Sequence, residues 1–172
     1  MKFKESDFVF FTCGDEDIDD ILNLQSSIFS SIDNQELLRK NTKKMFIECV
    51  KKPNITIGVK HKNKLIGLGI LYIPINIEED LSNLLIDVDT TNKKCANYKL
   101  CMVEKKYRGN NLQYILGKKL ELEAKQQGVN ILCSTVHPEN IYSKNNLIKL
   151  GYSYNTTIKK YDNIRDLFYK NI

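Results

Sequence analysis

Residues Tyr107–Gln113 combine an arginine, a glycine and two asparagines in a short turn, a pattern that can bind an anion. The turn follows the apolar, strand-like run 100–103 and opens an amphipathic helix. A strand, a turn and a helix N-terminus bring several backbone N–H groups together, with the positive end of the helix dipole behind them. Arg108 is one of only three arginines in the chain, and its planar guanidinium suits phosphate oxygens. We therefore expect a phosphate or pyrophosphate site here, rather than an ordinary solvated turn.

The segments around this turn alternate between strand-like and helix-like patterns. The first helix begins in the acidic run 15–20 and is broken at 30–33, and the connection 75–96 is long enough to be functional or to carry a helix. An Asp162-Asn163 turn separates the last two strands. The other patterns predict helices at 34–50, 111–127 and 139–150, and strands at 8–12, 55–60, 64–73, 97–103, 129–136, 152–161 and 165–169. This order predicts a mixed α/β layer fold.

Composition narrows the class of protein. With 172 residues, 42% of them hydrophobic, the chain suits a single domain, 1–172, with one sizeable core. No apolar run approaches the roughly 20 residues that span a bilayer, and the N-terminus lacks a secretory pattern, so we expect a cytoplasmic protein with no membrane partner. Five scattered cysteines without a Cys-x-x-Cys motif argue against disulfides and a metal site. The net charge of +5 suits a polyanionic ligand but is too modest for nucleic acid.

Two segments of the C-terminal half carry a family likeness. The first, 103–116, is a strand end, an aromatic residue with Arg-Gly, and a turn into a helix. The second, 136–143, places Ser143 three residues after Asn140 and continues to the Lys-Leu-Gly-Tyr run at 149–152. In this order and at this spacing, the two segments resemble the GNAT acetyltransferase superfamily. The resemblance implies a mixed, mostly antiparallel sheet of about six or seven strands, flanked by about four helices.

The same resemblance implies that the cosubstrate is acetyl-CoA, with no metal. It places the pyrophosphate on the backbone N–H groups of the turn, which are those of Arg108, Gly109, Asn110, Asn111, Leu112 and Gln113. It implies that Met102 and Val103 bind the pantetheine arm through their main chain, on the strand that also carries Cys101. Asn140 and Ser143 would approach the arm from the other side. Read from the residues alone, Asn140 is equally a helix cap, and Ser143 is a small packing residue.

The sequence departs from the family pattern at three positions. Asn111 stands where the family has a second turn glycine, but asparagine tolerates a left-handed backbone. Gln113 stands where the family has a small residue. Leu147 occupies the position where many members have a tyrosine that protonates the departing thiolate, so the catalytic residues stay unassigned. Two other candidates are weak, because a histidine before a proline, such as His137, is usually structural, and Cys101 has no visible partner to activate its thiol.

These observations favour an N-acetyltransferase that transfers an acetyl group to an amine by direct attack in a ternary complex. The acceptor is a small-molecule or peptide amine, which acids in 15–20 and 78–89 could attract if it is cationic. The main alternative is a non-catalytic acyl-CoA-binding module of the same fold, which Leu147 and Gln113 would suit. A second alternative, a nucleic-acid-binding domain, is suggested only by the many lysines. Monomer and homodimer are both compatible with the sequence.

Overall fold

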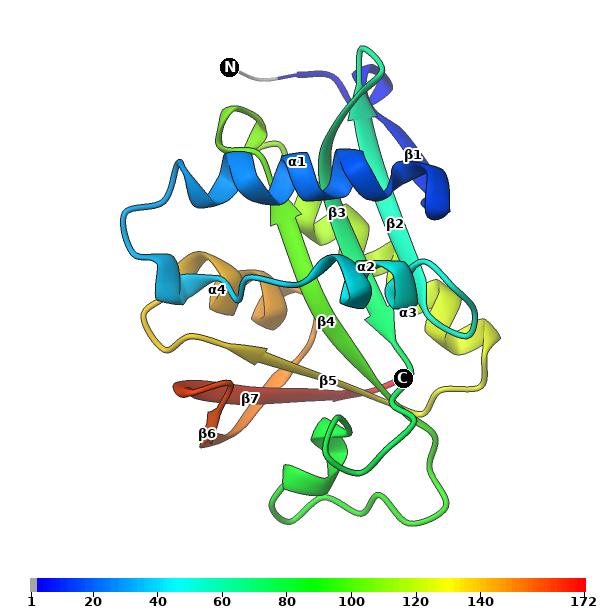
Figure 1. Ribbon diagram of the computed structural model, residues 1–172. Coiled ribbons are helices and arrows are strands. Elements are labelled where there is room, and N and C mark those ends of the chain that lie inside the picture. The colour runs from blue at the N-terminus through cyan, green and yellow to red at the C-terminus, as the bar shows by residue number, and fades with distance from the viewer. Residues whose placement is uncertain (1–2) are drawn as a thin grey trace.

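A seven-stranded sheet forms the centre of the molecule, in the order β1-β2-β3-β4-β5-β7-β6. The computed structural model of the chain describes residues 3–172. Neighbouring strands run antiparallel except β4 and β5, which are parallel. The strands are β1 (Val9–Thr12), β2 (Ile55–His61), β3 (Lys64–Tyr72), β4 (Cys95–Val103), β5 (Ile131–Val136), β6 (Ser153–Lys160) and β7 (Asn163–Asn171). The predicted order of elements and the mixed, mostly antiparallel sheet are confirmed (Figure 1).

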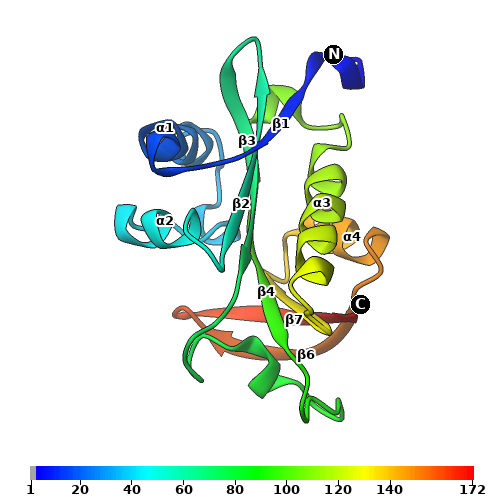
Figure 2. The same ribbon diagram turned by 90° about the vertical axis from the view of Figure 1, so that its right-hand side faces the viewer.

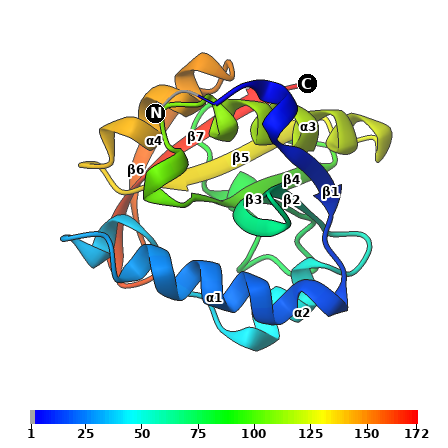
Figure 3. The ribbon, with the colours of Figure 1, turned by 90° about the horizontal axis from the view of Figure 1, so that it is seen from above.

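Helices cover both faces of this sheet. The α-helices are α1 (Ile18–Phe29), α2 (Lys43–Cys49), α3 (Leu112–Gln126) and α4 (Ile141–Lys149). Seen edge-on, α1 and α2 lie on one side of the sheet, and α3 and α4 lie on the other (Figure 2). The view from above shows the same three layers (Figure 3). Short 3-10 turns occupy η1 (Glu5–Asp7), η2 (Asp15–Asp17), η3 (Gln35–Leu37), η4 (Leu81–Leu84) and η5 (Lys105–Tyr107).

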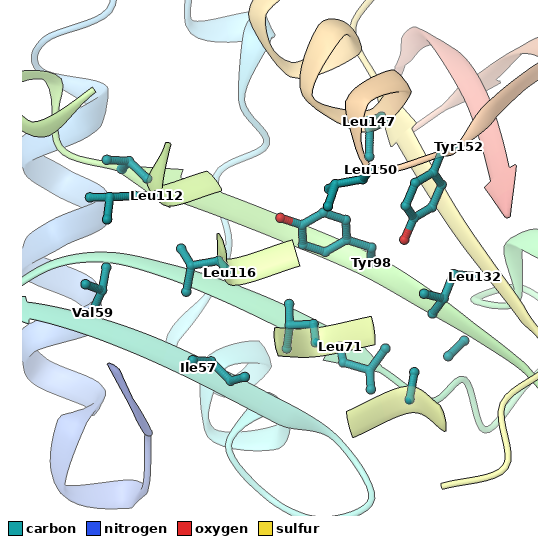
Figure 4. Close-up of a cluster of buried hydrophobic side chains, with 14 of the residues drawn as sticks. Ile57, Val59, Leu71, Tyr98, Leu112, Leu116, Leu132, Leu147, Leu150 and Tyr152 are labelled. Carbon is teal, nitrogen blue, oxygen red and sulfur yellow. The ribbon is translucent and has the colours of Figure 1, made fainter. Parts of the chain in front are cut away.

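Each face of the sheet has its own apolar core. Strand β3 is buried on both sides, and its side chains alternate, with Leu71 in the core beneath α3 and Ile70 in the core beneath α1. The core under α3 and α4 gathers Leu116, Tyr98 and Leu147 (Figure 4). Helix α3 lies close to the strands, because a Cβ atom on Gly69 would be 2.9 Å from the Leu120 side chain. The helix that follows the turn is therefore held firmly against the sheet.

The predicted helix at 34–50 is wrong in its first half. Only Lys43–Cys49 is α-helical, and 38–42 runs extended after the short turn η3. Thr42 begins α2 by accepting a hydrogen bond from the backbone N–H of Met45. The backbone of Asn41 is taken up by the buried side chain of Gln25, which accepts from its N–H at 2.8 Å and donates to its carbonyl at 2.9 Å. Gln25 thus fixes this loop to α1.

The turns of two hairpins differ by about one residue from the sequence prediction. Lys160 pairs with Asn163, so the last turn is Tyr161-Asp162 rather than Asp162-Asn163. In both hairpins the two turn residues have positive φ, at Lys62-Asn63 and at Tyr161-Asp162. Two consecutive residues of this kind match the twist of antiparallel strands. This shift of one residue places Tyr161 at the tip of the β6–β7 hairpin.

We expect Glu121→Gln to destabilise the protein by about 2 kcal/mol at neutral pH, because it leaves the partly buried Lys170 without its counter-charge. Glu121 is 5% exposed, and its carboxylate bridges Lys170 (2.6 Å), Lys125 (3.1 Å) and Lys118 (3.4 Å). Burial raises the pKa of Glu121, but the hydrogen bonds and charges of these lysines outweigh it, and the net pKa is lowered. Its stabilising contribution is therefore complete above the unfolded value of 4.5 and is lost as the pH falls below it.

Urea unfolding of the wild type and the variant at pH 7 and at pH 3 measures this difference. Glu123→Gln is the matched control, because Glu123 lies on the same helix and forms no ion pair among the described residues. If Glu121→Gln destabilises the protein equally at pH 7 and at pH 3, or if Glu123→Gln destabilises it as much, the stability does not come from the ionised carboxylate of Glu121.

Candidate functional site

Strands β4 and β5 separate after a short parallel ladder. Their pairing covers only Cys95–Asn97 and Ile131–Cys133. At the next residue the Ser134 hydroxyl donates to the carbonyl of Tyr98 at 3.0 Å, and beyond it the strands diverge (Figure 1). A cavity of about 1070 Å³ lies there, lined by 98–103 of β4 and 134–136 of β5. Its other walls come from both helical layers, so the cavity is reached from both faces of the sheet.

The edge of β4 presents unpaired backbone groups to this cavity. Gly67 is opposite Val103 and Leu68 is opposite Met102, while the N–H of Glu104 donates to the carbonyl of Ile66. Since hydrogen-bonding direction alternates along a strand, the backbone groups of Cys101 and Val103 face away from β3 and toward the gap. The carbonyl of Met102 faces β3, because it would lie 2.9 Å from a Cβ atom on Gly67.

This alternation corrects one sequence expectation. Met102 lines the cavity, but its side chain lies in the core beneath α1, and its main chain is directed to the neighbouring strand. Of the two residues that the resemblance assigns to backbone contacts, only Val103 presents its N–H to the gap. Cys101, which the sequence included as part of the same strand, presents the second such N–H.

The turn after β4 has the backbone that an anion site requires. Gly109 has φ of +81°, and Asn111 has φ of 61°, so the left-handed backbone expected of Asn111 is present. The Asn111 side chain accepts from Lys149 Nζ at 2.9 Å and does not cap α3. The first-turn N–H groups of α3 therefore stay available to a ligand. Arg108 donates its Nε to the carbonyl of Val103 at 3.1 Å, which holds the guanidinium beside the gap.

All but one of the predicted cofactor residues line the cavity. The exception is Asn110, whose side chain donates to the carbonyl of Tyr107 and accepts from the N–H of Phe3 at 3.0 Å. Asn110 therefore ties the N-terminal segment to the turn. The lining residues from that set are Cys101, Met102, Val103, Arg108, Gly109, Asn111, Leu112, Gln113, Asn140 and Ser143.

Solved structures with a similar arrangement of elements include GNAT-family acetyltransferases. An acetyltransferase of the GNAT family from Streptococcus pneumoniae superposes with a TM-score of 0.70 at 14% identity, covering 96% of this chain and 99% of that one. PaiA N-acetyltransferase from Thermoplasma acidophilum, solved with coenzyme A, has a TM-score of 0.71 at 14% identity, covering 96% and 99%. The chain has the GNAT fold. Its sequence matches no protein-family profile and no curated protein.

A third similar structure, the putative acetyltransferase yncA from Salmonella typhimurium, was determined with acetyl-CoA. It has a TM-score of 0.66 at 12% identity, covering 96% of this chain and 93% of that one. The structural neighbours across the whole chain are thus GNAT-family acetyltransferases, and two of the three carry coenzyme A or its acetyl thioester.

Helix α4 forms the wall of this GNAT fold opposite the turn. Asn140 caps it by accepting from the N–H of Ser143 at 3.1 Å, and its amide nitrogen donates to the carbonyl of Leu37 at 3.3 Å. The cap predicted for Asn140 is confirmed. Leu147 is 3% exposed and packs in the core beside Leu150 and Tyr98, so it gives the cavity an apolar wall with no acidic group (Figure 4).

The histidine candidate His137 and the nearby Tyr142 of α4 are not positioned as catalytic groups. His137 accepts a hydrogen bond from the N–H of Glu139 at 3.3 Å and is absent from the lining residues of the described cavity, as its structural interpretation requires. Tyr142 is 88% exposed at the rim. Burial is the larger effect on Cys101 and raises the pKa of its thiol to about 12, against the weaker lowering effect of a hydrogen bond from Tyr98. This thiol is protonated at neutral pH and is a poor nucleophile.

The sequence interpretation missed the end of the cavity that lies toward α1 and α2. Arg39, Lys99, Tyr161 and Arg165 line it, and they come from three separate parts of the chain, the last two from the β6–β7 hairpin. One signal was available, since the chain has only three arginines and all three line this cavity. The acids of 15–20 and 78–89, expected to attract a cationic amine, are absent from the lining of the described cavity.

None of the described helices is both long and apolar enough to cross a membrane.

Proposed function

We propose that this protein is an N-acetyltransferase that transfers an acetyl group from acetyl-CoA to the amine of an acceptor. The observation that carries the proposal is the gap between β4 and β5, which joins an anion-binding turn at one end to a separate polar chamber at the other. Two reactants can enter such a gap from opposite faces of the sheet and meet beside β4. Direct attack in a ternary complex needs this arrangement.

The residues of the cavity fit the chemistry of coenzyme A. The turn at Arg108–Gln113 offers backbone N–H groups, a helix N-terminus and a guanidinium to a pyrophosphate. The backbone groups of Cys101 and Val103 can extend the sheet to a pantetheine amide, as an added strand would. The neighbours solved with coenzyme A and acetyl-CoA support the same assignment.

Acetyl-CoA supplies an acetyl group activated as a thioester. The N–H of Val103 or of Cys101 is positioned on β4 to polarise a carbonyl in the gap. Leu147 and Val136 exclude water from one wall. The protonated thiol of Cys101 argues against an acyl-enzyme, so the neutral acceptor amine attacks the thioester carbonyl directly. The C–N bond forms, the C–S bond breaks, and coenzyme A leaves as its thiol with the proton that the amine nitrogen loses. Much of the acceleration then comes from holding the two reactants together, which can supply several kcal/mol without a dedicated acid.

A non-catalytic acyl-CoA-binding module is the second candidate. The observation that favours it is the buried leucine at 147, which cannot donate a proton. This module would keep the turn and the β4 edge but release no acetylated product.

One experiment separates these candidates. The purified protein is titrated calorimetrically with acetyl-CoA, and is then incubated with acetyl-CoA and a panel of amino acids, polyamines, amino sugars and short peptides. Mass spectrometry then detects any acetylated product. We expect binding together with turnover of at least one class of amine. Binding without turnover on any acceptor supports the non-catalytic module, and absence of binding by the folded protein rejects both.

A further inference from the structure

The charged residues that line the cavity are mostly cationic. Asp33 is the one acid among them in the described chain, while Arg39, Lys99, Lys105, Arg108 and Arg165 are cations. Arg108 belongs to the turn that would hold the pyrophosphate, and Lys105 lies in η5 directly before it. The other three cations lie at the opposite end, toward α1 and α2, where the coenzyme phosphates are not expected. We call Arg39, Lys99 and Arg165 the basic end.

Arg165 has a donor without an acceptor. This residue of β7 is 6% exposed, and its guanidinium donates from Nη2 to the carbonyl of Glu36 at 3.1 Å. Within residues 3–172, its Nε is buried and has no hydrogen-bond partner. Buried donors are nearly always satisfied in folded proteins, and an unpaired donor on a buried cation is particularly unfavourable. Arg165 also lines the cavity, so an anion bound there would offset the charge of this incompletely paired guanidinium.

Arg39 is held by stacking on an aromatic ring. Its guanidinium lies over the ring of Tyr161, with the central carbon 3.9 Å from the ring centroid. Stacking fixes the plane of the guanidinium while its N–H groups stay available for a two-point contact with an oxyanion. The extended segment that carries Arg39 is held in turn by the buried side chain of Gln25.

Lys99 reaches the same chamber because β4 is irregular. The register of β3 and β4 shifts between Ile70 and Leu71, and Lys99 is the extra residue of β4 at this point. Its Nζ lies over the Tyr72 ring, 3.7 Å from the centroid. The nearby acids Glu48 and Glu79 both accept hydrogen bonds from the Tyr72 hydroxyl, and neither lines the described cavity.

The cations of the basic end repel one another. Burial is the main reason that the pKa of Arg165 is lowered. Tyr161 raises this pKa, and the positive charge of Arg39 lowers it further. Burial is also the main reason that the pKa of Lys99 is lowered, although Cys49, Glu79 and Glu48 raise it and Arg39 lowers it further. Like charges gathered in a partly buried chamber are stabilised by an anion of opposite charge.

We propose that the basic end binds an oxyanion of the acceptor, so that the acceptor is a small amine that also carries a carboxylate or a phosphate. This inference rests on the proposed function, because it names the substrate class of the same site. The arrangement also suits the reaction. Cations close to the acceptor nitrogen disfavour its ammonium form, and only the neutral amine attacks a thioester.

The test uses acceptor pairs that differ only in the anionic group. Amino acids are compared with their amides, and 2-aminoethyl phosphate with ethanolamine, in the wild type, Arg165→Met and Arg39→Met. The ratio of kcat/KM within each pair is compared between variants, which cancels differences in amine basicity. We expect the wild type to prefer the anionic member of at least one pair, and each variant to reduce that preference about tenfold or more. The carboxylate and phosphate pairs identify which oxyanion is bound.

Lys159→Met is the matched control, because Lys159 is an exposed lysine of the neighbouring strand β6 outside the cavity lining. It should leave every ratio unchanged. Arg39 is exposed, so Arg39→Met decides the matter if Arg165→Met fails to fold. Circular dichroism of each variant identifies such a failure.

A second measurement does not depend on turnover. The protein saturated with coenzyme A is titrated with N-acetyl amino acids and with their amides. Tighter binding of the carboxylates than of the amides, with this difference lost in Arg39→Met, supports an anion site at the basic end. If this result is obtained but no amine is acetylated, the proposed function fails and the anion site remains. Equal binding of both members in the wild type, with amides acetylated as well as acids, overturns the inference and leaves the acetyltransferase standing.

Discussion

Arg108→Glu should weaken the binding of coenzyme A about 100-fold, which corresponds to about 2.7 kcal/mol. The side chain lies at the mouth of the gap, with its Nε donating to the carbonyl of Val103 at 3.1 Å and its other nitrogens free for phosphate oxygens. The substitution replaces an attraction by a repulsion. Two unit charges about 4 Å apart interact by about 1 kcal/mol in water and several-fold more at a partly buried site. Isothermal titration with coenzyme A measures the loss.

Lys106→Glu is the control for this substitution. Lys106 lies two residues before Arg108, and it is exposed and outside the cavity lining. Its replacement by glutamate changes the charge by the same amount. We expect its effect to be within about threefold, since an exposed charge is screened by salt. If the two variants weaken binding equally, the turn acts only through the general field of the protein. Unchanged affinity in a folded Arg108→Glu variant would remove the phosphate assignment altogether.

Much of this fold could be predicted from the sequence because its signals are local. Strands such as β3 and β5 are short apolar runs bounded by turn residues, and α3 carries leucines at helical spacing from Leu112 to Leu120. The Arg108–Gln113 turn was recognisable because glycine and asparagine mark left-handed positions, and both Gly109 and Asn111 adopt them. These properties depend only on neighbours in the chain.

The second chamber could not be predicted in the same way. Arg39, Lys99 and Arg165 are separated by at least 60 residues in sequence, and they meet only through tertiary structure. The extended course of 38–42 depends on hydrogen bonds from Gln25, a residue on another element. The helix predicted across 34–50 failed for this reason, because a buried side chain outweighed local helical propensity.

The faces on which the side chains of β4 lie could not be predicted from the sequence either. A regular strand would place Leu100 on the face of Tyr98, but the extra residue Lys99 moves Leu100 to the opposite core and Cys101 to the face of Tyr98. The sequence gives no indication of this shift, because the side chains of 98–103 all have a large apolar part and show no alternation of polar and apolar residues. The shift decides which backbone N–H groups face the gap, and therefore which residues can polarise a carbonyl there.

Ser143→Trp should abolish measurable coenzyme A binding, with a loss of at least about 100-fold in affinity. Ser143 lies in the first turn of α4, is only partly buried, and faces the gap between the two strands. An indole there would occupy space on the wall opposite Arg108 and the β4 edge, where the pantetheine arm is expected. A rigid, close-packed wall cannot move aside for a side chain of this size without strain.

Asn145→Trp provides the matched control on the same helix. Asn145 follows Ser143 by two residues, so it points about 200° around the helix, and it is exposed outside the cavity lining. Calorimetry should find wild-type affinity in this variant, and thermal unfolding should show both tryptophan variants folded. Retained coenzyme binding in a folded Ser143→Trp variant would mean that the ligand does not pass between β4 and β5. The anion-binding turn would then serve a ligand that stays on the surface of the protein.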